Sequence, residues 1–168
     1  MSNLKDIAVN LFNEGTATLL IGYEQGNGKL RPFFCRKPED CSRLVLNDDC
    51  KNNIAVYLTK PEIVAGEKIA VTATLPVLRT IVQLAMENQL SDGITAIVRD
   101  GNGHDCVALD SVEEMEKVLA DNPLDISGKE AELRARLKAM SREERWQFWV
   151  NEMSKCIKCY ACRAACPL

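Results

Sequence analysis

Hydrophobic residues follow two different spacings along the first 120 positions of the chain. From Leu4 to Phe12 they recur every three or four residues, which predicts a surface helix. Shorter continuous apolar runs, bounded by turn residues, predict strands. The predicted strands cover residues 18–23, 30–35, 44–46 (a short one), 68–74, 94–99 and 106–109. Further helices are predicted over residues 47–59, 76–90 and 111–120.

The order of these elements predicts the fold class. A strand, a helix and a second strand follow one another from Lys68 to Arg99, which is typical of a right-handed parallel crossover. Pro32 has no N–H for a sheet ladder, so strand 30–35 is expected at an edge. Residues 1–120 are therefore expected to form one three-layer α/β domain around a mixed or parallel sheet.

The chain changes character after residue 120. Residues 121–128 (DNPLDISG) are expected to be a linker. Residues 129–154 are predicted to form two short helices, opened by capping boxes at Ser127–Glu130 and Ser141–Glu144. Four large apolar side chains share one face of the second helix: Trp146, Trp149, Val150 and Met153. This face either packs on the rest of the chain or docks a partner.

Composition and charge exclude several functional classes. The 168 residues are 46% hydrophobic and 27% charged, as in an ordinary globular protein, and the net charge of −3 argues against a nucleic-acid-binding face. The N-terminal residues lack the long apolar core of a signal peptide, and no apolar run is long enough to cross a membrane. We therefore expect a cytoplasmic protein with reduced thiols.

The cysteines carry the strongest chemical pattern. Four of the eight lie within the tail 155–168, in the spacing CxxCxxCxxxCP, which is the run found in bacterial ferredoxins. Thiolates two residues apart can wrap a tight coil around one face of a cubane cluster. Zinc sites instead use CxxC knuckles separated by a dozen or more residues. The spacing therefore predicts a 4Fe–4S cluster, held by Cys156, Cys159, Cys162 and Cys166.

The sequence leaves three alternatives for the fourth ligand of this cluster. In two-cluster ferredoxins the last Cys of such a run ligates the other cluster, and this chain has one run. Cys166 could close the same cluster, or the missing half could come from a partner. A thiol from the α/β domain is the third alternative, and the candidates are Cys35, Cys41, Cys50 and Cys106.

Other candidate chemistry is weaker. Cys106, within a predicted strand, is expected to be a small buried residue. A second metal site would need Cys35, Cys41 and Cys50 together. His104 lies in a Gly-rich turn, where a surface role is expected rather than catalysis. Two GxG patterns, at residues 26–28 and 101–103, do not continue as a dinucleotide-binding motif.

Three stretches of the sequence can be matched to a known family. They are IGYEQGNGKLRPFFCRKPED with the following LVLNDDCKNNIAVYLTK, then ATLPVLRTIVQLAMENQL, and the tail CIKCYACRAACPL. Together they resemble the beta-subunit family of deazaflavin-reducing hydrogenases and formate dehydrogenases. The resemblance covers most of the chain, and the cluster motif is its specific part. Members pass electrons between clusters and some carry a flavin, so the resemblance implies an iron–sulfur subunit of an anaerobic redox complex.

The chain departs from that family in two places. Members carry a Cys before the helix that contains Arg79, where this chain has Thr74, Leu75 and Pro76. Members also continue beyond the CPL with more cysteines, whereas this sequence ends at Leu168, as a shortened chain would. Flavin binding, deazaflavin reduction and a second cluster are therefore not carried over, and a flavin is only weakly supported.

These observations predict a cytoplasmic electron-transfer subunit that relays single electrons through a 4Fe–4S cluster. Its expected partners are protein redox subunits of a hydrogenase, formate dehydrogenase or heterodisulfide reductase-like complex, with no nucleic acid. It is expected to be a component of an oxidoreductase rather than a stand-alone enzyme. Two alternatives stay open: a zinc-binding or assembly module without redox activity, and a fragment of a flavin-binding beta subunit.

Overall fold

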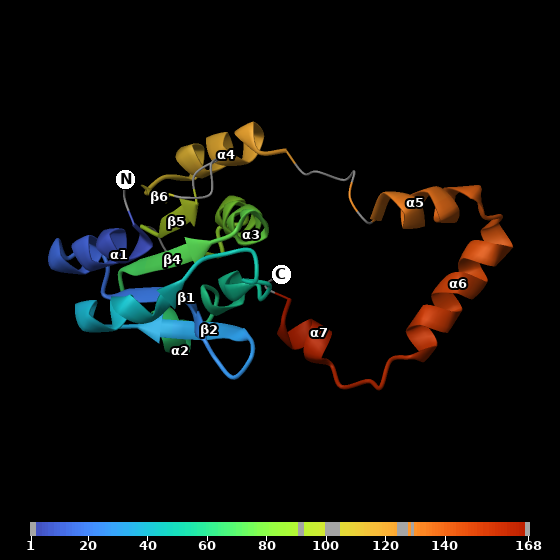
Figure 1. The fold of residues 1–168 in the computed structure, drawn as a ribbon, viewed down its shortest axis with the longest axis horizontal. Coiled ribbons are helices and arrows are strands. Elements are labelled where there is room, and N and C mark those ends of the chain that lie inside the picture. The colour runs from blue at the N-terminus through green and yellow to red at the C-terminus, as the bar shows by residue number, and fades with distance from the viewer. Residues whose placement is uncertain (1–2, 91–92, 100–104, 124–127, 129, 167–168) are drawn as a thin grey trace. The chain divides into compact units, whose positions relative to one another are not determined.

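The structure is a computed structural model that describes residues 3–90, 93–99, 105–123, 128 and 130–166 (Figure 1). The chain divides into two compact units, residues 1–122 with 165–168 and residues 123–164. Each unit is described by itself. The predicted roles of the second GxG pattern, of His104 and of Ser127 fall outside the described residues. No helix in the described part of the chain is both long and apolar enough to cross a membrane.

The first unit is built on a six-stranded mixed sheet, in which five strands have the order β2-β1-β4-β5-β6 and β3 pairs with β1 outside this order. β1 is parallel to β4, and β4 is parallel to β5, while β2, β3 and β6 run antiparallel to their neighbours. The strands are β1 (Leu19–Gln25), β2 (Leu30–Cys35), β3 (Leu44–Val45), β4 (Ile69–Ala73), β5 (Thr95–Arg99) and β6 (Cys106–Leu109). β2, which contains Pro32, is an edge strand as predicted.

Helices and short helical turns connect these strands and continue into the second unit. The first unit contains α1 (Leu4–Asn13), the 3₁₀ turns η1 (Pro38–Arg43) and η2 (Ile54–Tyr57), α2 (Pro61–Val64), α3 (Leu75–Met86) and α4 (Val112–Asp121). The second unit contains α5 (Glu130–Ala139), α6 (Arg142–Ser154) and α7 (Ala161–Ala164).

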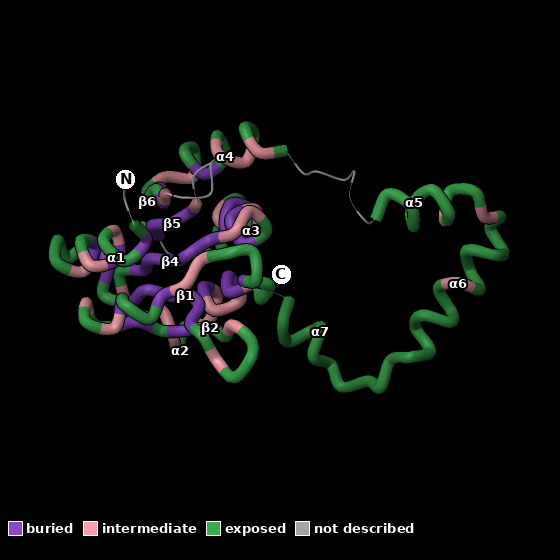
Figure 2. The backbone as a smooth tube through the Cα atoms, viewed as in Figure 1, coloured by how far each residue is buried: buried purple, intermediate pink, exposed green. Residues whose placement is uncertain are grey.

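The central strands β1, β4 and β5 are almost entirely buried (purple in Figure 2), and two cores lie on the two faces of the sheet. Successive residues of a strand point to opposite faces, so Leu19 and Ile21 of β1 enter one core and Leu20 enters the other. The first core contains side chains of α3, α4 and η2, and the second contains side chains of α1 and η1. The predicted three-layer α/β fold with a mixed sheet is confirmed.

The helix predicted over residues 47–59 is wrong. Asn47 and Asn53 use their side-chain oxygens to accept hydrogen bonds from the backbone N–H groups of Asp49 (2.9 Å) and Ala55 (3.2 Å). Such local bonds compete with helical pairing. Residues 46–53 therefore form a loop, the one-turn η2 follows, and α2, which the pattern did not predict, begins at Pro61.

The predicted helix over residues 76–90 exists as α3 but ends earlier, at Met86. Asn88 takes a left-handed conformation with φ of 54°, a common way to end a helix. Ser111 caps α4 as expected, with its side chain accepting from the Glu114 N–H. The second hydrogen bond of the capping box differs from the expected one. The Glu114 carboxylate accepts from the N–H of Asp110 instead of the N–H of Ser111.

In the second unit, α6 has the predicted capping box. The Ser141 hydroxyl accepts from the N–H of Glu144, and the Glu144 carboxylate accepts from the N–H of Ser141 at 2.7 Å. The apolar face predicted on this helix is exposed. The exposed fractions are 63% for Trp146, 47% for Trp149, 42% for Val150 and 68% for Met153.

The capping box of α6 predicts a pH dependence. The hydrogen bonds from Ser141 hold the pKa of the Glu144 carboxyl below its ordinary value. The stabilisation is therefore present above the ordinary Glu pKa and is lost as the pH falls through the lowered one. Ser141→Ala keeps the backbone N–H of residue 141, the larger cause of the shift, and removes the side-chain contribution. In this variant we therefore expect the pKa of Glu144 to rise part of the way to its ordinary value and the helical signal of the first turn to weaken, which NMR titration of the Glu144 carboxyl carbon measures.

Ser154→Ala is the matched control for this experiment. The Ser154 hydroxyl donates to the carbonyl of Asn151 at the other end of α6, so its removal should leave the titration of Glu144 unchanged. Identical Glu144 titration curves in the wild type and in Ser141→Ala would contradict the proposed role of the cap.

Candidate functional site

The predicted cluster ligands follow α6 directly. Cys156 and Cys159 lie in the coil after this helix, Cys162 lies in the short helix α7, and Cys166 follows α7. All four side chains are exposed free thiols. Soft thiolates at this spacing are the donor set that iron–sulfur clusters use.

The backbone between the first ligands has an unusual shape. Lys158 and Tyr160 have φ values of 56° and 58°, in the left-handed region that residues other than glycine rarely adopt. The N–H of Lys158 lies 3.4 Å from the Cys156 sulfur and donates a hydrogen bond to it. Hydrogen bonds to cysteine sulfur are one of the means by which proteins tune cluster potentials.

The tail does not present a ready-made metal site. Among the residues that the structure describes, no three Cys, His, Asp or Glu side chains come together in a metal-binding group. Ligand segments of small metal sites often acquire their fold together with the metal. The donor chemistry of the tail fits a cluster, although its described thiols do not converge in this structure.

The other four cysteines are structural in this fold. Cys35, Cys41, Cys50 and Cys106 are all buried, at exposed fractions of 8% or less. The sulfur atoms of Cys35 and Cys41 are 3.7 Å apart in one core, whereas Cys50 lies in the core on the other face of the sheet. The sheet thus separates the three residues of the second metal site considered above. Because they are buried, the thiols of these four cysteines are also poor ligands for a solvent-exposed cluster.

The two groups of cysteines should react very differently. Burial raises the pKa of Cys41 to about 12 and raises the pKa values of Cys35 and Cys50. Thiolates are the reactive species, so we expect iodoacetamide to label the tail at least about a hundredfold faster than these three thiols at pH 8. Mass spectrometry of the metal-free native chain measures this difference.

The control for the labelling experiment is the same chain in denaturant, where all the cysteines should react alike. Labelling of Cys41 as fast as Cys159 in the native chain would contradict the burial described above.

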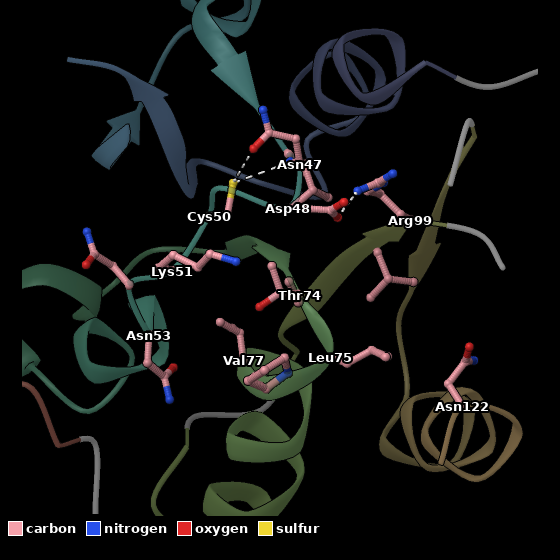
Figure 3. A pocket seen from close by; sticks show the side chains of 15 residues that line it. Asn47, Asp48, Cys50, Lys51, Asn53, Thr74, Leu75, Val77, Arg99 and Asn122 are labelled. Carbon is pink, nitrogen blue, oxygen red and sulfur yellow. Dashed lines mark hydrogen bonds and ion pairs between the residues drawn. The ribbon is translucent and has the colours of Figure 1, made fainter. Parts of the chain in front are cut away.

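The sequence analysis missed a cavity in the first unit. It has a volume of about 610 Å³ and lies at the carboxyl ends of β4 and β5 (Figure 3). Its walls are the loop 46–53, residues 73–77 at the start of α3, Val98 and Arg99 at the end of β5, and Asn122. The polar run NDDCKNN in the loop 46–53 is the one signal of this cavity in the sequence, although its pattern predicts the start of a helix.

Comparison with known proteins adds no family assignment. The chain matches no protein-family model, and it matches none of the curated proteins.

Proposed function

We propose that this protein is an iron–sulfur electron-transfer component of an oxidoreductase complex. The observation that carries the proposal is the set of four exposed free thiols in the spacing CxxCxxCxxxCP, contributed by Cys156, Cys159, Cys162 and Cys166. A bound 4Fe–4S cluster would supply one-electron chemistry. The chain itself supplies the ligands and the surface that meets a redox partner.

Two features of the backbone suit an anionic iron–sulfur cluster. The first is the hydrogen bond from the Lys158 N–H to the Cys156 sulfur. The second is the left-handed conformation of Lys158 and Tyr160, because left-handed residues form part of the backbone nests around many Fe–S sites. The overlapping ligand spacing also suits a cube with several irons better than one tetrahedral ion.

Charge supports a protein partner with an acidic docking surface. Residues 128–168 carry nine Lys and Arg against five Asp and Glu, although the whole chain has a net charge of −3. Lys155, Lys158 and Arg163 flank the ligands, and Lys155 pairs with Glu152 at 2.6 Å. Positive charge near the cluster would favour its reduced state and steer an acidic partner towards it.

The fourth ligand is proposed to be Cys166. The other candidate thiols, of Cys35, Cys41, Cys50 and Cys106, are buried in the two cores of the first unit, so recruiting one of them would require local unfolding. Cys166 is exposed and lies four residues beyond Cys162. Local closure of one cluster is therefore the simplest arrangement for this chain.

The deciding experiment is anaerobic purification followed by measurement of iron, acid-labile sulfide and zinc per chain. We expect about four irons and four sulfides, with broad absorbance near ~400 nm that bleaches on reduction by dithionite. A colourless chain with stoichiometric zinc would contradict the proposal and favour the non-redox alternative. A yellow cofactor released on heating would instead favour the flavin-binding alternative.

A further inference from the structure

The cavity at the carboxyl ends of β4 and β5 plays no part in the proposed electron transfer. In open α/β sheets, small molecules bind in the crevice outside the carboxyl ends of the strands. Here β4 pairs with the first part of β1 and β3 pairs with Tyr23 and Glu24 beyond it. The loop 46–53 after β3 and residues 74–77 after β4 therefore diverge from each other. Both segments line the cavity.

The size and lining of the cavity suit a small molecule. Its volume of about 610 Å³ lies within the range of ordinary ligand pockets. Leu46, Ala73 and Val98 give it an apolar part, while polar and charged groups from four separate segments surround the rest. These are Asn47, Asp48, Lys51, Asn52, Asn53, Thr74, Arg99 and Asn122.

Two cationic side chains line the polar part, together with one carboxylate and four amide side chains. Lys51 extends from the loop towards the first turn of α3 (Figure 3), and its ammonium has no partner among the described residues. Arg99 brings a second cation and is paired at 2.7 Å with Asp48, whose side chain is 94% exposed.

The wall formed by α3 adds unused hydrogen-bond donors. Leu78 is bonded to the Thr74 carbonyl, so the N–H groups of Leu75 and Val77, which precede it, have no acceptor within the helix. The Thr74 hydroxyl makes no capping bond to them. This helix terminus therefore adds partial positive charge to a cavity that already holds Lys51 and Arg99.

We propose that this cavity binds a small organic phosphate monoester. The phosphate would accept hydrogen bonds from the first turn of α3, the Thr74 hydroxyl and the Lys51 ammonium, as anions at helix N-termini do. The organic part would lie against Leu46, Ala73 and Val98. The inference does not depend on the cluster, because every residue that carries it lies in the first unit.

The test uses the full chain and measures the shift in melting temperature with increasing ligand. The probes are inorganic phosphate, ribose 5-phosphate and adenosine monophosphate, with ribose and adenosine as their uncharged counterparts. We expect a saturable rise in melting temperature with the phosphates, because a ligand that binds only the folded state stabilises it. Ribose and adenosine should give no saturable rise at up to about 10 mM.

Two variants locate the effect in the cavity. Lys51→Glu should weaken binding by about tenfold or more, and Thr74→Val should weaken it by about fivefold. The matched control is Lys117→Glu on α4, an exposed lysine outside the cavity with the same charge change, which should keep the wild-type affinity. The melting temperature without ligand shows whether each variant is folded.

Three results would each overturn the proposal. One is the absence of any saturable shift with the phosphates in folded wild-type protein. Another is equal stabilisation by adenosine and adenosine monophosphate, which would show that the phosphate makes no contribution. The third is unchanged affinity in Lys51→Glu. Iron content is measured separately, so failure here leaves the proposed electron-transfer function intact.

Discussion

Replacing Cys159 by Ala is expected to remove most of the iron from the anaerobically purified chain. Cys159 is the middle of the three closely spaced ligands. Without it only Cys156 and Cys162 remain in this coil, and two thiolates bind a cluster much more weakly than three. Because Cys159 is exposed, the substitution leaves no cavity in a core. Iron and sulfide analysis together with the absorbance near ~400 nm measures the loss.

Cys41→Ala is the matched control for the cluster experiment, because it also removes one thiol but from a buried position. It should retain the wild-type iron content per folded chain. Cys166→Ala should lose iron as Cys159→Ala does if the cluster is closed locally. Full retention in Cys166→Ala would show that the fourth ligand comes from elsewhere, and full retention in Cys159→Ala would refute the proposed site.

Leu78→Ala is expected to destabilise the first unit by about 2–5 kcal/mol, the range for deleting a buried leucine side chain. Leu78 lies on α3 with an exposed fraction of 0%, within the core that joins this helix to the sheet. The lost methyl groups leave a cavity that the packed strands cannot fill. Urea denaturation followed by circular dichroism measures the free energy of unfolding.

Met86→Ala tests the same helix without disturbing the core. Met86 is the last residue of α3 and is 67% exposed, so the free energy of unfolding should change by less than about 0.5 kcal/mol. Equal destabilisation by the two substitutions would mean that α3 does not pack as described.

Much of the fold could be predicted because its information is local. The strands β1, β4 and β5 are buried on both faces, and continuous apolar runs such as TLLIGY and KIAVTAT predict such strands. The caps at Ser111 and Ser141 follow from short motifs in which each residue contacts the next turn. These predictions needed no knowledge of distant residues.

The errors occurred where local and tertiary preferences compete. Residues 47–59 carry acidic and amide residues that suit a helix start, yet the side chains of Asn47 and Asn53 bond to nearby N–H groups. The hydroxyl of Tyr23 in β1 also donates to the carbonyl of Asn52, at 2.5 Å. A contact between residues so far apart in the sequence is invisible in a local pattern.

The two candidate sites, the cysteine tail and the cavity, also differ in whether neighbouring or distant residues form them. The ligand spacing from Cys156 to Cys166 is a property of adjacent residues, so the sequence by itself determined the cluster hypothesis, the α/β class and the capped helices. The cavity brings together the loop 46–53, the start of α3 and the end of β5. Only the tertiary structure decided that these segments meet, and that four cysteines are buried while four are exposed, because packing around a sheet depends on which strands become neighbours.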